Sequence, residues 1–113
     1  MLEETFRLPA LSATEALNKA RDGAMLIDLR KPAAVLASGQ RIKGTVIRDP
    51  YVFSHEDPLT QANDPLITFC VHGHEVSQFA CALLMLHGRD VHYVTGGFEA
   101  LVNAGAELED IQR

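Results

Sequence analysis

Apolar and polar positions alternate in blocks along the chain, and the blocks predict strands and helices in turn. Short apolar runs rich in β-branched or aromatic residues are typical of buried strands. They span residues 24–27, 45–47, 66–69 and 91–94. Helices are predicted where apolar residues recur between start and stop signals, from a capping box at 12–15 to Gly23, and at 33–38, 78–86 and 98–104. The segment 49–65 holds three prolines and is predicted to be mainly irregular, with one helical turn.

Strand and helix alternation at this spacing implies right-handed crossovers and a mostly parallel sheet covered on both faces. We therefore predict an α/β fold in a single domain spanning residues 1–113, with its core at about 12–106. Ligands of such sheets bind at the carboxyl ends of the strands. Asp28, Arg30, Cys70 and Thr95 follow predicted strands, so we expect that they could converge on one site.

Composition narrows the classes of partner. The chain has 113 residues, is 47% hydrophobic and 22% charged, and carries a formal net charge of −5. Its Lys and Arg residues form no cluster, which argues against nucleic acid as the main partner. The acidic start, Met1–Glu4, lacks the profile of a signal peptide, and no apolar run is long enough to cross a bilayer. We expect a soluble, cytoplasmic protein with no membrane partner.

Cys70 is the residue that most suggests chemistry. It ends the apolar run at 66–69 and opens a polar loop that leads into an apolar helix. The helix amino terminus would present free N–H groups and a positive dipole, which favour a thiolate or a bound anion. A thiolate is the nucleophilic form of cysteine, so the pattern predicts a cysteine-dependent enzyme. Cys81, between Ala80 and Ala82, is interpreted as a small core residue.

A metal site is an alternative interpretation of the same loop. Cys70, His72 and His74 lie at alternate positions, and His55 and His92 could complete a tetrahedral set. Zinc sites usually combine paired ligands from two separated motifs, and N–H groups that favour an anion would oppose a cation. We therefore expect no metal.

Four segments, in this order and spacing, resemble the rhodanese-like domain over nearly the whole chain. They are the apolar strand ending in Asp-x-Arg at 25–30, the glycine-bounded segment 39–44, the loop 70–77, and the closing signature at 88–91 and 96–98.

The resemblance implies a five-stranded parallel sheet and sulfurtransferase chemistry. Cys70 would carry sulfane sulfur as a persulfide, taken from thiosulfate, a polysulfide or a persulfide and passed to cyanide, a thiol or a protein. Neither a metal nor an organic cofactor is implied, and Arg30 would border the pocket. The N–H groups that would cradle the anionic sulfur belong to Val71, His72, Gly73, His74, Glu75, Val76 and Ser77.

The loop departs from the family pattern Cys-x-x-Gly-x-Arg-Ser. It is one residue longer, and neither Glu75 nor Val76 can replace the arginine, which holds two oxyanion oxygens with a permanent charge. The His74 side chain would be at most partly protonated near neutral pH, so it would not supply a permanent positive charge. Thiosulfate is therefore expected to be a poor donor, and a protein persulfide, a neutral polysulfide or glutathione persulfide a better one. Related cysteine phosphatases need an arginine at the position of Val76, so that activity is disfavoured.

A third functional class is a non-catalytic, regulatory or docking module, which the presence of Cys70 makes less favoured.

Two further positions have structural interpretations. Asp28 is expected to act as a structural cap or ion pair, and the acidic stretch from Glu107 to Asp110 as a solvated terminal face. The oligomeric state stays open.

Overall fold

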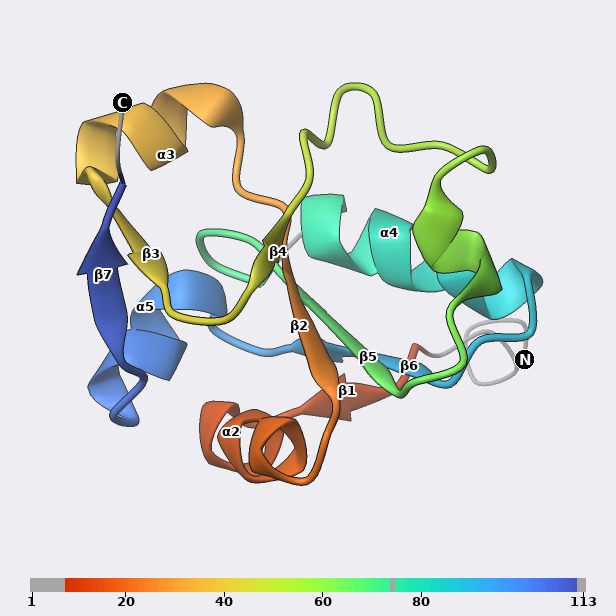
Figure 1. Ribbon diagram of the computed structural model, residues 1–113, viewed down its shortest axis with the longest axis horizontal. Coiled ribbons are helices and arrows are strands. Elements are labelled where there is room, and N and C mark those ends of the chain that lie inside the picture. The colour runs from red at the N-terminus through yellow and green to blue at the C-terminus, as the bar shows by residue number, and fades with distance from the viewer. Residues whose placement is uncertain (1–7, 74, 112–113) are drawn as a thin grey trace.

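The computed structural model describes residues 8–73 and 75–111. Five short parallel strands form one sheet in the order β1–β6–β5–β2–β4 (Figure 1). Their bounds are Ala10–Leu11 (β1), Met25–Asp28 (β2), Val46–Ile47 (β4), Leu66–Phe69 (β5) and Val91–Val94 (β6). The predicted α/β fold is confirmed. The fifth strand, β1, was not located from the pattern because two residues are too few to show alternation.

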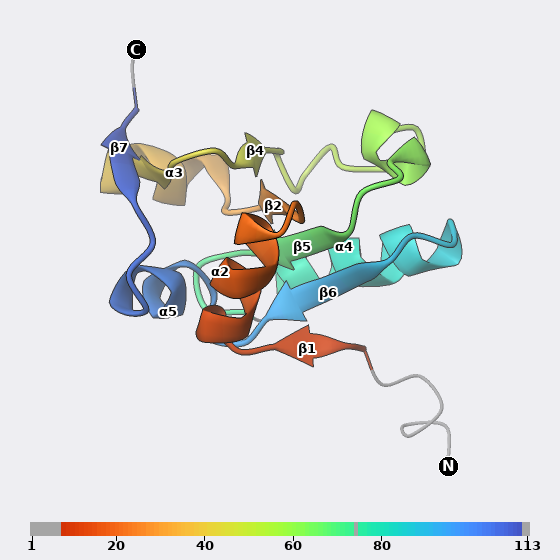
Figure 2. The same ribbon diagram turned by 60° about the horizontal axis from the view of Figure 1, so that its bottom comes forward.

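Helices cover both faces of the sheet, as predicted. Helices α2 (Ala13–Arg21) and α5 (Gly97–Asn103) lie over one face, and α4 (Glu75–Leu86) lies over the other (Figures 1 and 2). Successive strand residues point to opposite faces. In β5, Leu66 packs in the cluster under α4, whereas Ile67 and Phe69 pack under α2 and α5. Every residue of β5 is buried, so this central strand anchors whatever follows it.

The helix boundaries follow local signals in most places. Ser12 caps α2, where its Oγ accepts a hydrogen bond from the Glu15 N–H at 3.1 Å and its own N–H donates to Glu15 Oε1 at 2.9 Å. Helix α3 (Pro32–Ser38) ends at Gly39, whose φ of +69° suits glycine. The predicted helical turn within 49–65 is the 3₁₀ helix η1 (Pro58–Gln61). Helix α4 begins at Glu75, earlier than the predicted residue 78, because polar residues are also favoured in a first helical turn.

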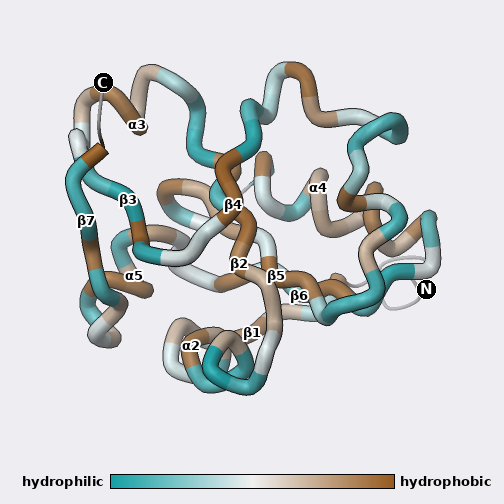
Figure 3. Tube along the Cα trace, viewed as in Figure 1, coloured by the Kyte–Doolittle hydropathy of each residue, from teal (hydrophilic) through white to brown (hydrophobic). Residues whose placement is uncertain are grey.

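A second, two-stranded sheet was not predicted. Strands β3 (Gln40–Ile42) and β7 (Leu108–Asp110) pair antiparallel, with Arg41 opposite Glu109. The residues of β7 are exposed, as expected of a solvated face, and β3 and β7 carry mainly hydrophilic residues (Figure 3). The pairing was missed because it joins segments far apart in the sequence, and polar residues give no strand alternation. Within the described residues, no helix is long and apolar enough to cross a bilayer.

Candidate active site

Cys70 follows the central strand β5 directly and is 7% exposed. Backbone hydrogen bonds hold the chain on both sides of it. The carbonyl of Cys70 accepts from the Phe98 N–H at 2.7 Å, and the carbonyl of Phe69 accepts from the Leu29 N–H at 2.8 Å. The thiol is therefore fixed at the carboxyl edge of the sheet, between the ends of β2 and β6.

Two glycines lock the loop after Cys70 onto the turn after β6. Gly73 has φ +74°, and a Cβ there would lie 2.5 Å from the carbonyl oxygen of Val94. Gly97 has φ +58°, and a Cβ there would lie 2.3 Å from the carbonyl oxygen of Cys70 and 2.6 Å from that of Val71. Real Cβ atoms do not approach backbone oxygens this closely. Glycine is therefore required at both positions by space as well as by the left-handed backbone.

Ser77 provides a polar neighbour for the thiol. Its Oγ lies 3.2 Å from Cys70 Sγ, within sulfur hydrogen-bond distance, and the serine is fully buried. Thr68, two residues before the cysteine in β5, donates from Oγ1 to the Ser77 carbonyl at 2.9 Å. A serine hydroxyl can both accept from a thiol and donate to a thiolate, so this contact serves either state of Cys70.

The amino terminus of α4 adjoins the same loop. Its first N–H groups have no intrahelical acceptor, and the helix dipole places partial positive charge there. Gln78, in the first turn, donates from Nε2 to the Gly73 carbonyl at 3.1 Å and so ties the helix to the loop. The predicted contribution of His74 lies outside the described residues.

Cys70 opens into a pocket of about 410 Å³. Of the residues predicted to bind substrate, Val71, His72, Glu75 and Val76 line this pocket with Cys70. Sequence reasoning missed the other lining residues, Leu29, Lys31, Ala34. They could have been suspected, because they follow the end of β2 at the same edge of the sheet.

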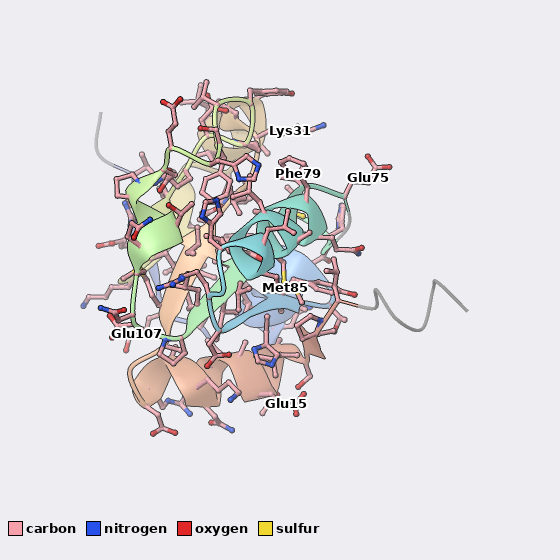
Figure 4. The ribbon with its side chains drawn as sticks, turned by 90° about the vertical axis from the view of Figure 1, so that its right-hand side faces the viewer. Glu15, Lys31, Glu75, Phe79, Met85 and Glu107 are labelled. Atoms are coloured by element: carbon pink, nitrogen blue, oxygen red, sulfur yellow. The ribbon has the colours of Figure 1, made fainter. Side chains whose placement is uncertain are left out.

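The charges at this pocket are mixed. Lys31 and Glu75 are exposed and extend from different elements (Figure 4). His72 is also exposed, and its Nδ1 lies 3.9 Å from the Glu99 carboxylate. Among the lining residues that the structure describes, the pocket therefore presents one permanent cation, Lys31, and one carboxylate, Glu75.

Arg30, which the resemblance implied would border the pocket, is held in a buried ion pair. It is 2% exposed, is not among the described residues that line the pocket, and pairs with Asp28 at 2.8 Å. Its guanidinium also donates to the Gln40 carbonyl and stacks over Phe98, 4.0 Å from the ring centroid. Arg30 thus neutralises the fully buried Asp28 and links the end of β2 to α5. The contact with Asp28 is the ion pair that was predicted for it. Thr95 donates from its hydroxyl to the Leu11 carbonyl, so it links the end of β6 to β1.

Cys81 is a different kind of thiol. It is fully buried among apolar side chains of α4 and the sheet. Burial raises the pKa of the Cys81 thiol to about 12. A thiol that stays protonated is a poor nucleophile, in agreement with its interpretation as a core residue.

The other histidines considered as metal ligands lie apart from the loop. His55 contacts His87, with Nδ1 and Nε2 2.9 Å apart. His92 is paired in register with Ile67, three residues before Cys70 and so about 10 Å back along the strand. Among the residues that the structure describes, no group of three or more His, Cys, Asp or Glu side chains could hold a metal.

Comparisons with solved structures show the same fold. A Rhodopseudomonas palustris protein of unknown function, described as a possible tyrosine phosphatase, is 21% identical, with a TM-score of 0.74 over 95% of this chain and 89% of its own. A Pseudomonas aeruginosa thiosulfate sulfurtransferase is 20% identical, with a TM-score of 0.74 over 92% of this chain and 20% of its own.

A Saccharomyces cerevisiae homolog of single-domain rhodanese and the Cdc25 phosphatase catalytic domain is 17% identical, with a TM-score of 0.67 over 85% of this chain and 80% of its own. Among curated proteins, none matches the chain significantly. The sequence pattern of the rhodanese-like domain matches residues 12–104. Most of the chain lies within this match, and the chain belongs to the rhodanese-like domain family.

Proposed function

We propose that this protein is a sulfurtransferase that carries sulfane sulfur as a persulfide on Cys70. The observation that carries the proposal is the setting of the thiol. It lies at a strand end beside the α4 amino terminus, 3.2 Å from the Ser77 hydroxyl, and it opens into a pocket of about 410 Å³. Membership of the family and the fold of the Pseudomonas aeruginosa sulfurtransferase support the same chemistry.

The reaction has two displacements at sulfur. The Cys70 thiolate attacks the outer sulfur of a donor R–S–SH, a new S–S bond forms, the donor S–S bond breaks, and R–SH leaves with the proton. An acceptor thiolate then attacks the outer sulfur of the Cys70 persulfide. The electron pair of the broken bond returns to Cys70, and the acceptor leaves as a persulfide, so no outside oxidant or reductant is needed.

The charges around the pocket favour a persulfide or polysulfide over thiosulfate as donor. The second product of thiosulfate would be sulfite, a dianion, and binding such anions calls for bidentate, permanent positive charge. Lys31 is the sole Lys or Arg among the described residues that line the pocket, and Glu75 opposes its charge. Acceptors are proposed to be thiols, either small molecules or cysteines of a partner protein, in the cytoplasm.

Two competing functions are less well supported. A phosphatase would need an arginine where this chain has Val76, a half-buried side chain that lines both the Cys70 pocket and a neighbouring one. A non-catalytic module would not need a thiol held against a buried serine. The contact between Cys70 and Ser77 therefore argues against the non-catalytic module, and the missing arginine argues against the phosphatase.

Mass spectrometry of the purified protein tests the proposal directly. After incubation with inorganic polysulfide and removal of excess reagent, we expect a gain of about 32 Da, one sulfur, on the peptide that contains Cys70. Adding a small thiol should remove it and release the thiol persulfide. Absence of the adduct on Cys70, or an adduct that no thiol removes, would contradict the proposal.

A further inference from the structure

A second pocket of about 190 Å³ adjoins the one at Cys70. Leu29, Glu75 and Val76 line both, so the two pockets share a wall. The rest of the smaller pocket is apolar: its other lining residues are Pro50, Phe53, Phe79 and Ala80. Neither the persulfide step nor the anion cradle uses this space.

Its size and lining indicate the kind of group that it would accept. An apolar cavity of about 150 Å³ is large enough to bind benzene, so about 190 Å³ suits a ring of that size or an alkyl chain of about six carbons. Ala80 and Phe53 are buried at 1% and 7% exposure, whereas the ring of Phe79 is 60% exposed. Phe79 is therefore an open apolar wall that a ligand could cover.

The position of the pocket relates it to the reacting sulfur. Glu75 lines the pocket at Cys70, and Phe79, four residues later on α4, lines the smaller pocket. Residues four apart on a helix are displaced by about 6 Å along its axis. A group a few carbons long attached to a sulfur at Cys70 could span that distance. The Glu75 carboxylate stands at the shared wall, where it would repel a negatively charged tail.

We propose that the apolar pocket is a subsite for the hydrocarbon tail of the sulfur acceptor, and that this protein transfers sulfur to small, uncharged alkyl or aryl thiols. This inference rests on the proposed function. The thiolate of such an acceptor attacks the outer sulfur of the Cys70 persulfide, the S–S bond to Cys70 breaks, and its electron pair stays on Cys70. The products are the Cys70 thiolate and the alkyl persulfide, and the acceptor proton goes to solvent.

The test uses the full chain, loaded with one sulfur by polysulfide, and a series of acceptors from ethanethiol to hexanethiol and phenylmethanethiol. The second-order rate constant for discharge of the persulfide is measured for each, with cyanide as a tail-free reference. Burial of one methylene favours binding by up to about fourfold. We expect the rate constant, corrected for the intrinsic reactivity of each thiol with a small-molecule persulfide, to rise about two- to fourfold per methylene until the pocket is filled.

Phe79→Ser removes the open wall and should flatten this dependence while leaving discharge by cyanide unchanged. Met85→Ser is the matched control, because Met85 is a 41% exposed apolar residue of the same helix and lines neither pocket (Figure 4). It should keep the wild-type slope. A rate constant independent of chain length, or a slope that persists in Phe79→Ser, would overturn the subsite. Failure of Cys70 to accept sulfur at all would instead contradict the proposed function, and the loading step reveals that separately.

Discussion

Two cysteines lie eleven residues apart in one strand–loop–helix unit, yet their surroundings differ. Both side chains are largely buried, at 7% exposure for Cys70 and 0% for Cys81. Cys70 has the Ser77 hydroxyl at 3.2 Å and faces a pocket, whereas Cys81 has apolar neighbours and a pKa raised to about 12 by burial. Burial alone therefore does not distinguish the two thiols. They differ in their polar partners and in the open face that Cys70 has at the end of a strand.

The backbone around the two thiols differs in the same way. Cys81 sits in the middle of a regular helix, which needs no special residue to hold it. Cys70 precedes a loop that closes only because Gly73 and Gly97 bring backbone atoms into direct contact. The position of Cys70 thus depends on a tight, glycine-dependent junction between two strand ends, whereas the position of Cys81 depends on core packing.

The largest expected effect is that of Cys70→Ser, which should abolish persulfide formation, because a hydroxyl cannot carry the sulfane sulfur. Cys81→Ser should leave sulfur transfer intact and lower the free energy of unfolding by about 1–3 kcal/mol, since it places a hydroxyl among apolar side chains. Mass spectrometry and urea unfolding measure the two effects. Loss of sulfur loading in a correctly folded Cys81→Ser variant would show that the comparison between the thiols is wrong.

The next largest effect concerns the glycine junction. Gly73→Ala and Gly88→Ala impose the same left-handed strain, because their φ angles are +74° and +75°. A Cβ at Gly88 meets nothing within 4 Å, whereas one at Gly73 collides with the Val94 carbonyl. We expect Gly88→Ala to cost about 1–2 kcal/mol of unfolding free energy and Gly73→Ala about 2–5 kcal/mol, measured by urea unfolding. Equal costs would mean that the contact between the loop and the β6 turn does not constrain Cys70.

Glu75→Arg should lower the KM for thiosulfate about tenfold to a hundredfold, because it removes a negative charge and adds a bidentate donor at the Cys70 pocket. Glu75→Gln should change KM in the same direction by less, since it lifts the repulsion alone. Steady-state kinetics with cyanide as acceptor provide the measurement. Unchanged KM values in both variants would show that the side chain at this position does not meet the donor.

The smallest effect is expected for Ser77→Ala, which removes the polar partner of the Cys70 sulfur. A typical hydrogen bond contributes about 0.5–1.5 kcal/mol, so the rate of sulfur loading should fall roughly two- to tenfold. Ser54→Ala, at an exposed serine, is the control and should load at the wild-type rate. If Ser77→Ala loads sulfur as fast as this control, the Ser77 hydroxyl does not assist Cys70, and the two cysteines do not differ in this respect.

Local signals predicted most of the fold and part of the site. The capping box at Ser12, the αL glycine at Gly39 and the apolar strands act over a few residues, so a single sequence displays them. The position of Cys70 at the end of the central strand is of this kind, as is the burial of Cys81. The two-residue strand β1 and the polar pair β3–β7 were missed, because neither carries an apolar alternation.

The amino-acid sequence by itself determined that Cys70 ends a buried strand before a helix, since strand, loop and helix propensities are local. Only the tertiary structure decided what surrounds it. Arg30 could have bordered the pocket, but the buried Asp28 and the ring of Phe98 hold it inside, because an unpaired buried carboxylate would be costly. Leu29, Lys31 and Ala34 reach the pocket from the segment that follows β2. Such contacts arise from packing between distant segments, which no local pattern encodes.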